Sequence, residues 1–389
     1  MKKLTHAEFL DMRRFDALDG LRAIAAVIVV FFHLGGPTTA FLSGWIGVHI
    51  FFVVSGFLIT TLLLREKDRT GRISLPAFYL RRIFRIMPLY YLALALTVAS
   101  TYHRGTPWLL LKGHLPEYLT FMNEYHLDVS TPFVHTWTLG IEQKLYLFWP
   151  LALVLVGLLT NRLRIPLCIG LIVLVVIPWN NYLATSGIHY SVLLIGGLLA
   201  LVLHSPRGFA LLSPLTHPIA GGVLLAGVVW LHLSIPGLVA HFHSELPPIF
   251  LYGLAIALLI PSLLNAGIGR SVLTLRPMVF VGERSYGLYL FQFLAAAMVY
   301  ALFPDVRRDT PLAAAIVVLT SLAIADLTHR RLEEPMIQVG RRLTRRITGR
   351  ARTAPGPGTE QNPAAVGDLA GVGQGPFSLP AAAARPADR

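Results

Sequence analysis

The sequence predicts an all-α fold, a polytopic membrane helical bundle of about ten transmembrane helices. Hydrophobic residues make up 54% of the 389 residues and charged residues only 14%, whereas a soluble domain usually carries about 25% charged residues. The mean hydropathy is +0.63. The apolar residues also gather in runs of about 17 to 25, which is the length of a helix that crosses a bilayer.

Most charged residues stand at the ends of these runs. In chain order, the predicted helices span 20–37, 45–64, 86–102, 138–159, 165–183, 188–204, 215–234, 246–265, 284–303 and 311–330. The charged residues next to these runs are Asp19, Arg65, Arg85, Arg162, Arg164, Arg207, Arg270, Arg284 and Arg330. No small-residue cleavage site follows the first run, so we expect a retained helix rather than a signal peptide. We find no internal repeat, which weighs against transporters built from paired halves.

Lysine and arginine are distributed unequally between the two sides of such a bundle. With both termini in the cytoplasm, the outer loops hold only Arg104, Lys112, Arg307 and Arg308. This asymmetry follows the positive-inside rule, so we expect a multi-pass protein of the cell (plasma) membrane with both termini cytoplasmic. It also explains the formal net charge of +13. Because no aromatic-basic binding motif accompanies the basic residues, we expect the lipid bilayer and no nucleic acid as partner.

The chain divides into three predicted parts. Residues 1–19 form a cytoplasmic N-terminal segment, 20–346 a membrane-embedded domain, and 347–389 a Pro/Ala/Gly-rich cytoplasmic tail that we expect to be disordered. The longest external stretch, 102–136, is rich in histidine and acidic residues and is either a lid or an ordinary solvated loop. The single cysteine, Cys168, excludes an internal disulfide, and we expect it to be a small buried side chain.

Arg22 and His33 interrupt the first apolar run, "LDGLRAIAAVIVVFFHLG", and are the most informative polar residues of the chain. At about 100° per residue their spacing puts both side chains on one helical face, roughly 16 Å apart along the axis. Ionisable groups inside a membrane are costly and usually serve a function. We therefore take this pair as the first candidate for chemistry.

Two further motifs follow in the next predicted helices. In "GVHIFFVVSGFLIT", Ser55 and Gly56 form a small-residue pair, for which close helix packing is favoured over direct contact with substrate. In "FYLRRIFRIMPLYYL", Arg82 and Arg85 are neighbours on one helical face. Such a face can bind phosphate through paired charge-assisted hydrogen bonds. The alternative is a basic cluster that holds anionic lipid headgroups.

The fourth motif is "HTWTLGIEQKLYLFWP", near the outer end of its predicted helix. Residues two apart face different directions, so Glu142 is not expected to pair with Lys144. We expect His33, at a comparable depth, to be the partner of Glu142. An interfacial aromatic belt is predicted to include Trp137, Tyr146 and Trp149.

Together these residues suggest a division of labour across the membrane. Arginines on the cytoplasmic side bind an anionic donor, while His33 acts as general base on a hydroxyl and Glu142 orients its ring. The predicted reaction class is acyl transfer to an alcohol.

These segments, in this order, resemble the acyltransferase 3 family of membrane O-acyltransferases, which includes surface-polysaccharide O-acetylases and macrolide O-acyltransferases. The resemblance covers roughly residues 16–346. It rests on six motifs in register, which are Arg22 with ten residues before His33, "FFVVSGFLI", "RRIFRIMPLYY", "HTWTLGIE" through "YLFWP", "SYGLYLFQF" and "LEEP".

The resemblance implies a ten-helix core and an acyl-coenzyme A cosubstrate held from the cytoplasmic side, without a metal. It implies transfer of an acyl group, expected to be acetyl, to a hydroxyl of a carbohydrate, a glycolipid or a macrolide-type natural product. Many members add a soluble esterase-like domain, and here we expect the membrane core to complete the transfer. The candidate residues are catalytic His33 and Glu142, donor-binding Arg22, Arg82 and Arg85, and substrate-binding Ser55, Trp137, Tyr286 and Gln292.

Three positions depart from the family pattern. Relatives commonly read Glu-Glu-Gln at residues 142–144, where this chain has Glu-Gln-Lys, carry His at the position of Gln292, and often have Asp at the position of His49. We interpret these as acceptor-specific changes. Two other functions stay open from the sequence alone. One is a polytopic transporter whose pathway uses the buried ionisable groups, and the other is a protein that binds donor or glycan without turnover.

Overall fold

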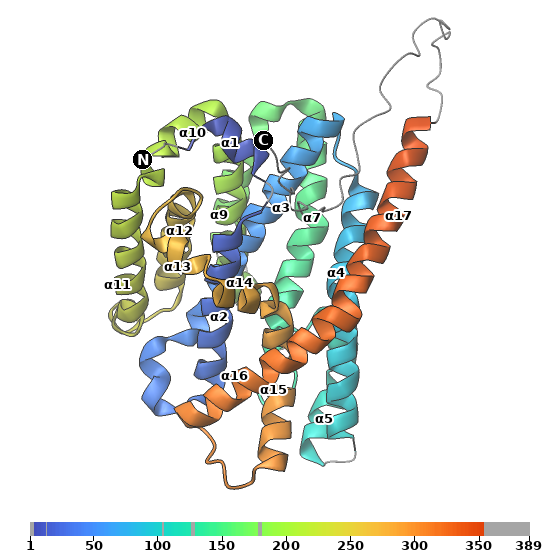
Figure 1. The fold of residues 1–389 in the computed structure, drawn as a ribbon, viewed down its shortest axis with the longest axis vertical. Coiled ribbons are helices and arrows are strands. Elements are labelled where there is room, and N and C mark those ends of the chain that lie inside the picture. Colours follow the sequence, from blue (N-terminus) through green and yellow to red (C-terminus); the bar gives the residue numbers. More distant parts are fainter. Residues whose placement is uncertain (1–3, 13, 103–104, 126–128, 178–180, 354–389) are drawn as a thin grey trace, which may run out of the picture. The chain divides into compact units, whose positions relative to one another are not determined.

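The computed structural model describes residues 4–12, 14–102, 105–125, 129–177 and 181–353. No strand occurs among them, which confirms the predicted all-α class. Figure 1 shows the helices packed side by side as a bundle. The long helices are α2 (Asp16–Leu34), α3 (Val48–Thr70), α4 (Leu75–Thr101), α7 (Trp137–Leu159), α8 (Arg164–Val176), α9 (Asn181–His204), α11 (Pro218–Phe242), α12 (Leu246–Leu263), α15 (Ser285–Leu302), α16 (Pro311–Thr328) and α17 (Glu334–Thr353).

Shorter helices connect them and cover the ends of the bundle. The α-helical ones are α1 (His6–Asp11), α5 (Thr106–Gly113), α6 (Leu115–Thr120), α10 (Pro206–Leu212), α13 (Ile268–Leu273) and α14 (Arg276–Glu283). The others are η1 (Pro37–Leu42), η2 (Gly44–Gly47), η3 (Val134–Thr136), η4 (Asn161–Leu163), η5 (Ser213–Thr216) and the π-helical η6 (His329–Glu333).

Nine helical stretches of the described residues are long and apolar enough to cross a membrane, so the chain is a multi-pass membrane protein. They correspond to nine of the ten predicted helices. The remaining one, 165–183, falls on α8, which has 13 residues, and on residues 178–180, which lie outside the described part. The last stretch, Pro311–Ile347, is longer than predicted because α16 continues through the π-helical turn into α17.

Helix α3 packs closely along α9 and also contacts α2, α7 and α12. Glycines make the close approach. A Cβ atom at Gly56 would collide with the backbone carbonyl of Leu193, and one at Gly196 with that of Val53. Small residues let membrane helices approach in this way, so the predicted packing role of Gly56 is confirmed. Cys168 is buried against α9, as predicted, with Sγ 3.4 Å from the Leu194 carbonyl oxygen.

We expect Gly56→Ala to destabilise the bundle by about 1–3 kcal/mol, because the obstructing atoms belong to backbone and the two helices must separate. Denaturant titration of the purified protein in detergent measures this loss. Gly170→Ala, in α8, is the matched control, because a Cβ there meets no atom within 4 Å. Equal stability of the two variants would contradict the packing role.

The segment between α4 and α7 is anchored inside the bundle at Glu124. This buried carboxylate forms an ion pair with Lys144 of α7, and the Tyr190 hydroxyl of α9 lies 3.4 Å from its Oε1. Lys144 also donates to the carbonyl oxygen of Phe121 at 2.9 Å. The expected absence of a pair between Lys144 and its neighbour at position 142 is thus confirmed. Residues 103 and 126–128, which carry part of the predicted external cluster, lie outside the described residues.

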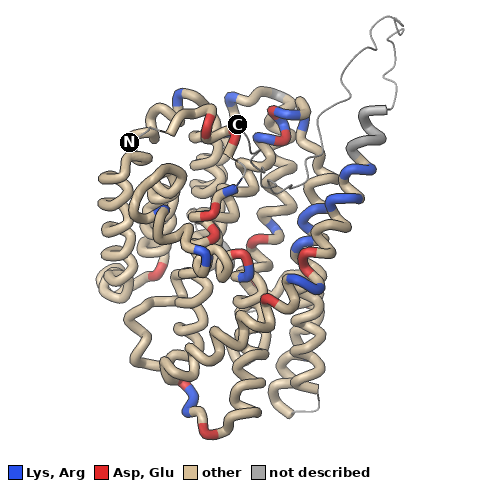
Figure 2. The backbone as a smooth tube through the Cα atoms, viewed as in Figure 1, with Lys and Arg blue, Asp and Glu red and all other residues tan. Residues whose placement is uncertain are grey.

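Charged side chains are sparse along most of the bundle and frequent on α17, as Figure 2 shows. That helix continues past the predicted domain boundary at residue 346, and the tail from residue 354 lies outside the described part. Residues up to Thr348 form one compact unit, and the functional site described below belongs to it.

Candidate functional site

A cavity of about 170 Å³ lies between five helices, α2, α3, α4, α7 and α15. A cavity of roughly 150 Å³ holds one benzene molecule, so this one accommodates a small organic group rather than a whole nucleotide. Its walls are largely apolar. Its polar lining residues are Arg22, Ser55, Arg82, Arg85, Thr138, Glu142, Tyr146, Ser285, Tyr286 and Tyr289.

The three predicted donor-binding arginines meet at this cavity from two helices. Arg82 and Arg85 reach it together from α4, because residues three apart share a helical face. Arg22 reaches it from α2, with its guanidinium 3.6 Å from Asp19 and 5.8 Å from the centroid of the Phe51 ring. In the part of the chain that the structure describes, neither Arg82 nor Arg85 forms an ion pair with a carboxylate, whereas Arg81 of the same helix pairs with Glu66. Positive charge is therefore available to a ligand.

Glu142 contributes the carboxylate of the cavity lining. Its Oε1 accepts a hydrogen bond from the Ser55 hydroxyl at 3.3 Å, and its Oε2 contacts the hydroxyl of Tyr146, one turn further along α7. The Tyr146 hydroxyl also lies 3.1 Å from Ser55 Oγ. The cavity lining holds three guanidinium groups and one carboxylate, so it attracts anions. Among the described residues, no group of three or more His, Cys, Asp or Glu side chains is placed to hold a metal ion.

His33 lies near the C-terminal end of α2 and is not part of the cavity lining. Its Nδ1 is 3.1 Å from Oε1 of Gln292 on α15, and Gln292 is completely buried. The predicted pairing of His33 with Glu142 is therefore wrong. The physical reason is distance along α2, because the cavity lies at the Arg22 end and His33 is roughly 16 Å further along the axis.

One turn of α15 separates the cavity from His33. Gln292 Nε2 donates to the carbonyl oxygen of Tyr289 at 3.0 Å, and Tyr289 lines the cavity. The Tyr289 hydroxyl lies 2.9 Å from Thr138 Oγ1 and also contacts the carbonyl oxygen of His135. The buried His135 ring lies 3.1 Å, by Nε2, from the Leu290 carbonyl oxygen. His33 and the cavity that Glu142 lines are thus adjacent but not in contact.

Of the two remaining candidates, one lines the cavity and the other does not. Tyr286 lines the cavity and donates its hydroxyl to the Ile86 carbonyl oxygen at 2.9 Å, whereas Trp137 packs against the ring of His189 away from the lining. The predicted aromatic belt is wrong for Tyr146, which lines the cavity, and for Trp149, which is buried and bonds Thr60 at 2.7 Å.

The sequence analysis missed four polar residues of the cavity lining, which are Thr138, Tyr146, Ser285 and Tyr289. For Tyr146 a signal was present, since it stands four residues after Glu142 and so shares its helical face. For Tyr289 the motif "SYGLYLFQF" offered several aromatic residues and no way to choose among them.

Lys144, Gln292 and His49, three of the positions that depart from the family pattern, have hydrogen-bonding partners, whereas the buried Nε2 of the fourth, Gln143, has none among the described residues. Lys144 pairs with Glu124 and Gln292 with His33, as described above. His49 lies 3.0 Å from His189 through Nε2 and 3.0 Å from the Ile46 carbonyl oxygen through Nδ1. The substitutions at residues 49, 144 and 292 are therefore accommodated inside the bundle.

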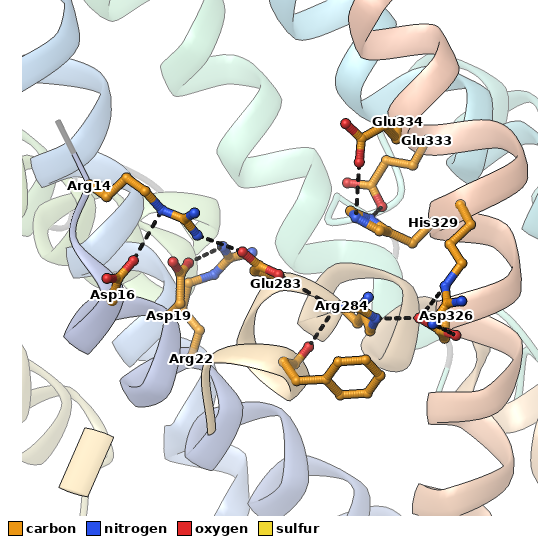
Figure 3. Close-up of polar contacts among 12 residues, drawn as sticks. Arg14, Asp16, Asp19, Arg22, Glu283, Arg284, Asp326, His329, Glu333 and Glu334 are labelled. Atoms are coloured by element: carbon orange, nitrogen blue, oxygen red, sulfur yellow. Dashed lines mark hydrogen bonds and ion pairs between the residues drawn. The ribbon is translucent and has the colours of Figure 1, made fainter. Parts of the chain in front are cut away.

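Ion pairs connect the residues just before α2 to the end of α14, and the junction of α14 and α15 to α16, as Figure 3 shows. Arg14 bonds Glu283 at 2.7 Å, and this hydrogen bond raises the pKa of the Arg14 guanidinium. Arg284, next in the chain, bonds Asp326 at 2.7 Å. The contact of Arg14 with Glu283 fixes the start of the helix that carries Arg22 into the cavity.

Comparison with known proteins covers the whole of this site. A family model described as an acyltransferase domain matches residues 15–330, which include every residue of the cavity lining. No solved structure matches the chain.

Relatives with matching sequences are named as O-acetyltransferases. The peptidoglycan O-acetyltransferase OatA of Listeria monocytogenes is 29% identical over 362 residues, which cover 83% of this chain and 56% of the relative. The putative peptidoglycan O-acetyltransferase YrhL of Bacillus subtilis is 28% identical, with 86% and 57% covered. A putative O-acetyltransferase of Staphylococcus aureus is 26% identical, with 86% and 59% covered. The chain thus spans a little over half the length of these relatives.

Proposed function

Since this chain belongs to the acyltransferase 3 family, we propose that it is a membrane O-acyltransferase that moves an acetyl group from acyl-coenzyme A to a hydroxyl of a cell-envelope saccharide. The observation that carries this proposal is the cavity whose lining holds three guanidinium groups, those of Arg22, Arg82 and Arg85, and one carboxylate, that of Glu142. An anionic donor matches that charge, and an acetyl thioester matches the small volume.

The donor is held by charge at one end and by shape at the other. Arg82 and Arg85 bind phosphate oxygens of coenzyme A, because guanidinium groups make paired charge-assisted hydrogen bonds to such oxygens. The thioester end enters the cavity, where Ser55 and Tyr286 are neighbouring polar contacts. Arg22 completes the positive lining from α2.

His33 acts as the general base. It removes the proton of the acceptor hydroxyl as the oxygen attacks the thioester carbonyl, the carbon–sulfur bond breaks, and coenzyme A leaves as a thiolate. The imidazolium of His33 then protonates the thiolate, so that the base is regenerated. His33 and the cavity are connected through Gln292 and Tyr289, which lie one turn apart on α15.

The acceptor approaches from the outer face. With the N-terminal end of α2 in the cytoplasm, Arg22 lies toward the cytoplasm and His33 toward the outer surface of the plasma membrane. Relatives named for peptidoglycan acetylation favour an amino-sugar polymer as acceptor. Glycolipids and macrolide-type products are the alternative acceptors.

The test uses the purified protein in liposomes with radiolabelled acetyl-coenzyme A. Soluble peptidoglycan fragments, a surface polysaccharide, a glycolipid and a macrolide are supplied in parallel as acceptors. We expect an acetyl ester on the peptidoglycan fragments. Donor binding without product on any acceptor would replace the proposal with a binding function, and acceptor flux without donor would replace it with transport.

We expect Arg82→Ala and Arg85→Ala each to raise the KM for acetyl-coenzyme A about 10- to 100-fold, because hydrogen bonds to charged groups contribute about 1.5–3 kcal/mol. The KM for the acceptor stays nearly unchanged. Steady-state kinetics at varied donor concentration measure both constants. Arg81→Ala is the matched control, since Arg81 is on the same helix but pairs with Glu66 at 2.6 Å. Equal effects of all three substitutions would contradict a specific donor contact.

A further inference from the structure

Gln292 occupies a position between the cavity wall and His33. Its side chain is completely buried and reaches a ring nitrogen of His33 with one amide atom and the backbone of its own helix with the other. It does not line the cavity. Its location is therefore that of a residue that acts through His33.

The orientation of the Gln292 amide follows from hydrogen-bonding chemistry. The carbonyl oxygen of Tyr289 can only accept a hydrogen bond. The amide atom 3.0 Å from it must therefore be the NH2 nitrogen, Nε2. The amide oxygen, Oε1, then faces Nδ1 of His33 at 3.1 Å. The reversed amide would place two oxygens against each other inside the bundle, at the cost of a buried unpaired group.

The tautomer of His33 follows in turn. An amide oxygen accepts, so Nδ1 of His33 must carry the proton. In the neutral ring the other nitrogen, Nε2, then holds the free lone pair. We infer that Gln292 is a positioning residue, which fixes His33 in the Nδ1–H tautomer and so assigns Nε2 as the atom that accepts the proton of the acceptor hydroxyl. This inference rests on the proposed function for the base role of His33.

The same argument explains how this chain does without the histidine that is usual at position 292. An imidazole has one donor and one acceptor nitrogen when neutral, as a carboxamide has a donor and an acceptor group. Either side chain can donate to the Tyr289 carbonyl and accept from Nδ1. Glutamine keeps that pattern without titrating, so the tautomer of His33 does not depend on the protonation of its neighbour.

The first experiment reads the tautomer directly. Histidine labelled with 15N in the full chain gives separate signals for protonated and unprotonated ring nitrogens, and the His33 signals are those missing in His33→Gln. We expect protonated Nδ1 and unprotonated Nε2 in the parent protein, and a mixture of both tautomers in Gln292→Met. A protonated Nε2 in the neutral parent ring would overturn the inference, whether or not the chain transfers acetyl groups.

The second experiment reads the consequence for transfer. We expect Gln292→Met to lower kcat about 10- to 100-fold, as loss of a residue that orients a functional histidine commonly does, with the donor KM nearly unchanged. His135, whose ring packs on Phe293 beside His33, is the nearest second titratable ring and is kept intact.

Gln292→His is expected to restore most of the rate, and Gln338→Leu, at an exposed position of α17, is the control for loss of a glutamine. An unchanged kcat in Gln292→Met would overturn the positioning role. Failure of the parent protein to transfer acetyl groups to any acceptor would instead remove the proposed function and leave the tautomer result standing.

Discussion

Replacing His33 with alanine is expected to lower the rate of acetyl transfer about 10²- to 10⁴-fold, which is the usual contribution of a general base. Binding of acetyl-coenzyme A should be retained, because His33 lies outside the cavity that the arginines line. Transfer of labelled acetyl groups at saturating donor, together with the dissociation constant of the donor, separates the two effects.

The matched control for this substitution is His241→Ala, which removes an exposed histidine near the end of α11. It should transfer at the parental rate. If His33→Ala also transferred at that rate, His33 would not be the base, and the buried His135 would become the candidate to test next. If His33→Ala lost donor binding as well, the histidine would be acting on the structure of the cavity.

The sequence predicted those parts of the site that depend on a single helix. Arg82 and Arg85 were assigned to one surface from their spacing alone, and both line the cavity. Gly56 was assigned to a packing contact because a small residue interrupts a bulky helix, and it contacts the α9 backbone. In each case the period of the α-helix converts a sequence interval into a direction.

Contacts between helices could not be predicted in the same way. The prediction that His33 pairs with Glu142 rests on a comparable depth in the bilayer, but depth does not determine which helices are neighbours or how each is rotated. The partner of His33 is 259 positions away in the sequence, on α15, and Glu142 bonds Ser55 on α3. Such pairs depend on tertiary packing, for which one sequence contains no direct measure.

The aromatic belt shows the same limit. Tyr146 and Trp149 combine an apolar ring with a polar atom, which suits a membrane interface. It also suits a buried site where that polar atom finds a partner. Trp149 donates to Thr60, and Tyr146 contacts Glu142, so both are satisfied inside the bundle. Composition alone does not distinguish the two environments.

Lys144 is a departure from the family pattern whose partner the structure identifies. Its ammonium group forms an ion pair with Glu124, a residue only 3% exposed, and lies 4.9 Å from the centroid of the Tyr125 ring. The second oxygen of Glu124, Oε2, packs closely against Gly140, where a Cβ atom would collide with it. Among the described residues, this oxygen has no hydrogen-bond partner. The lysine therefore neutralises a carboxylate that has little other solvation.

We expect Lys144→Met to destabilise the protein by about 3–5 kcal/mol, because removal of one partner leaves an uncompensated buried charge. Denaturant titration in detergent measures the loss. The double variant Lys144→Met/Glu124→Gln should recover most of the stability, since a neutral amide no longer needs the ammonium group and can still bond Tyr190. Lys112→Met, at an exposed position of α5, is the control for loss of a lysine.

The double variant also tests whether the pair matters for function. If the pair only stabilises the segment between α4 and α7, the double variant should transfer acetyl groups at close to the parental rate. If the positive charge of Lys144 also contributes to the electrostatic potential of the cavity, the double variant should be stable but transfer acetyl groups more slowly than the parent. A Lys144→Met protein as stable as the parent would contradict the buried pair itself, because an unpaired carboxylate at Glu124 could not then be costly.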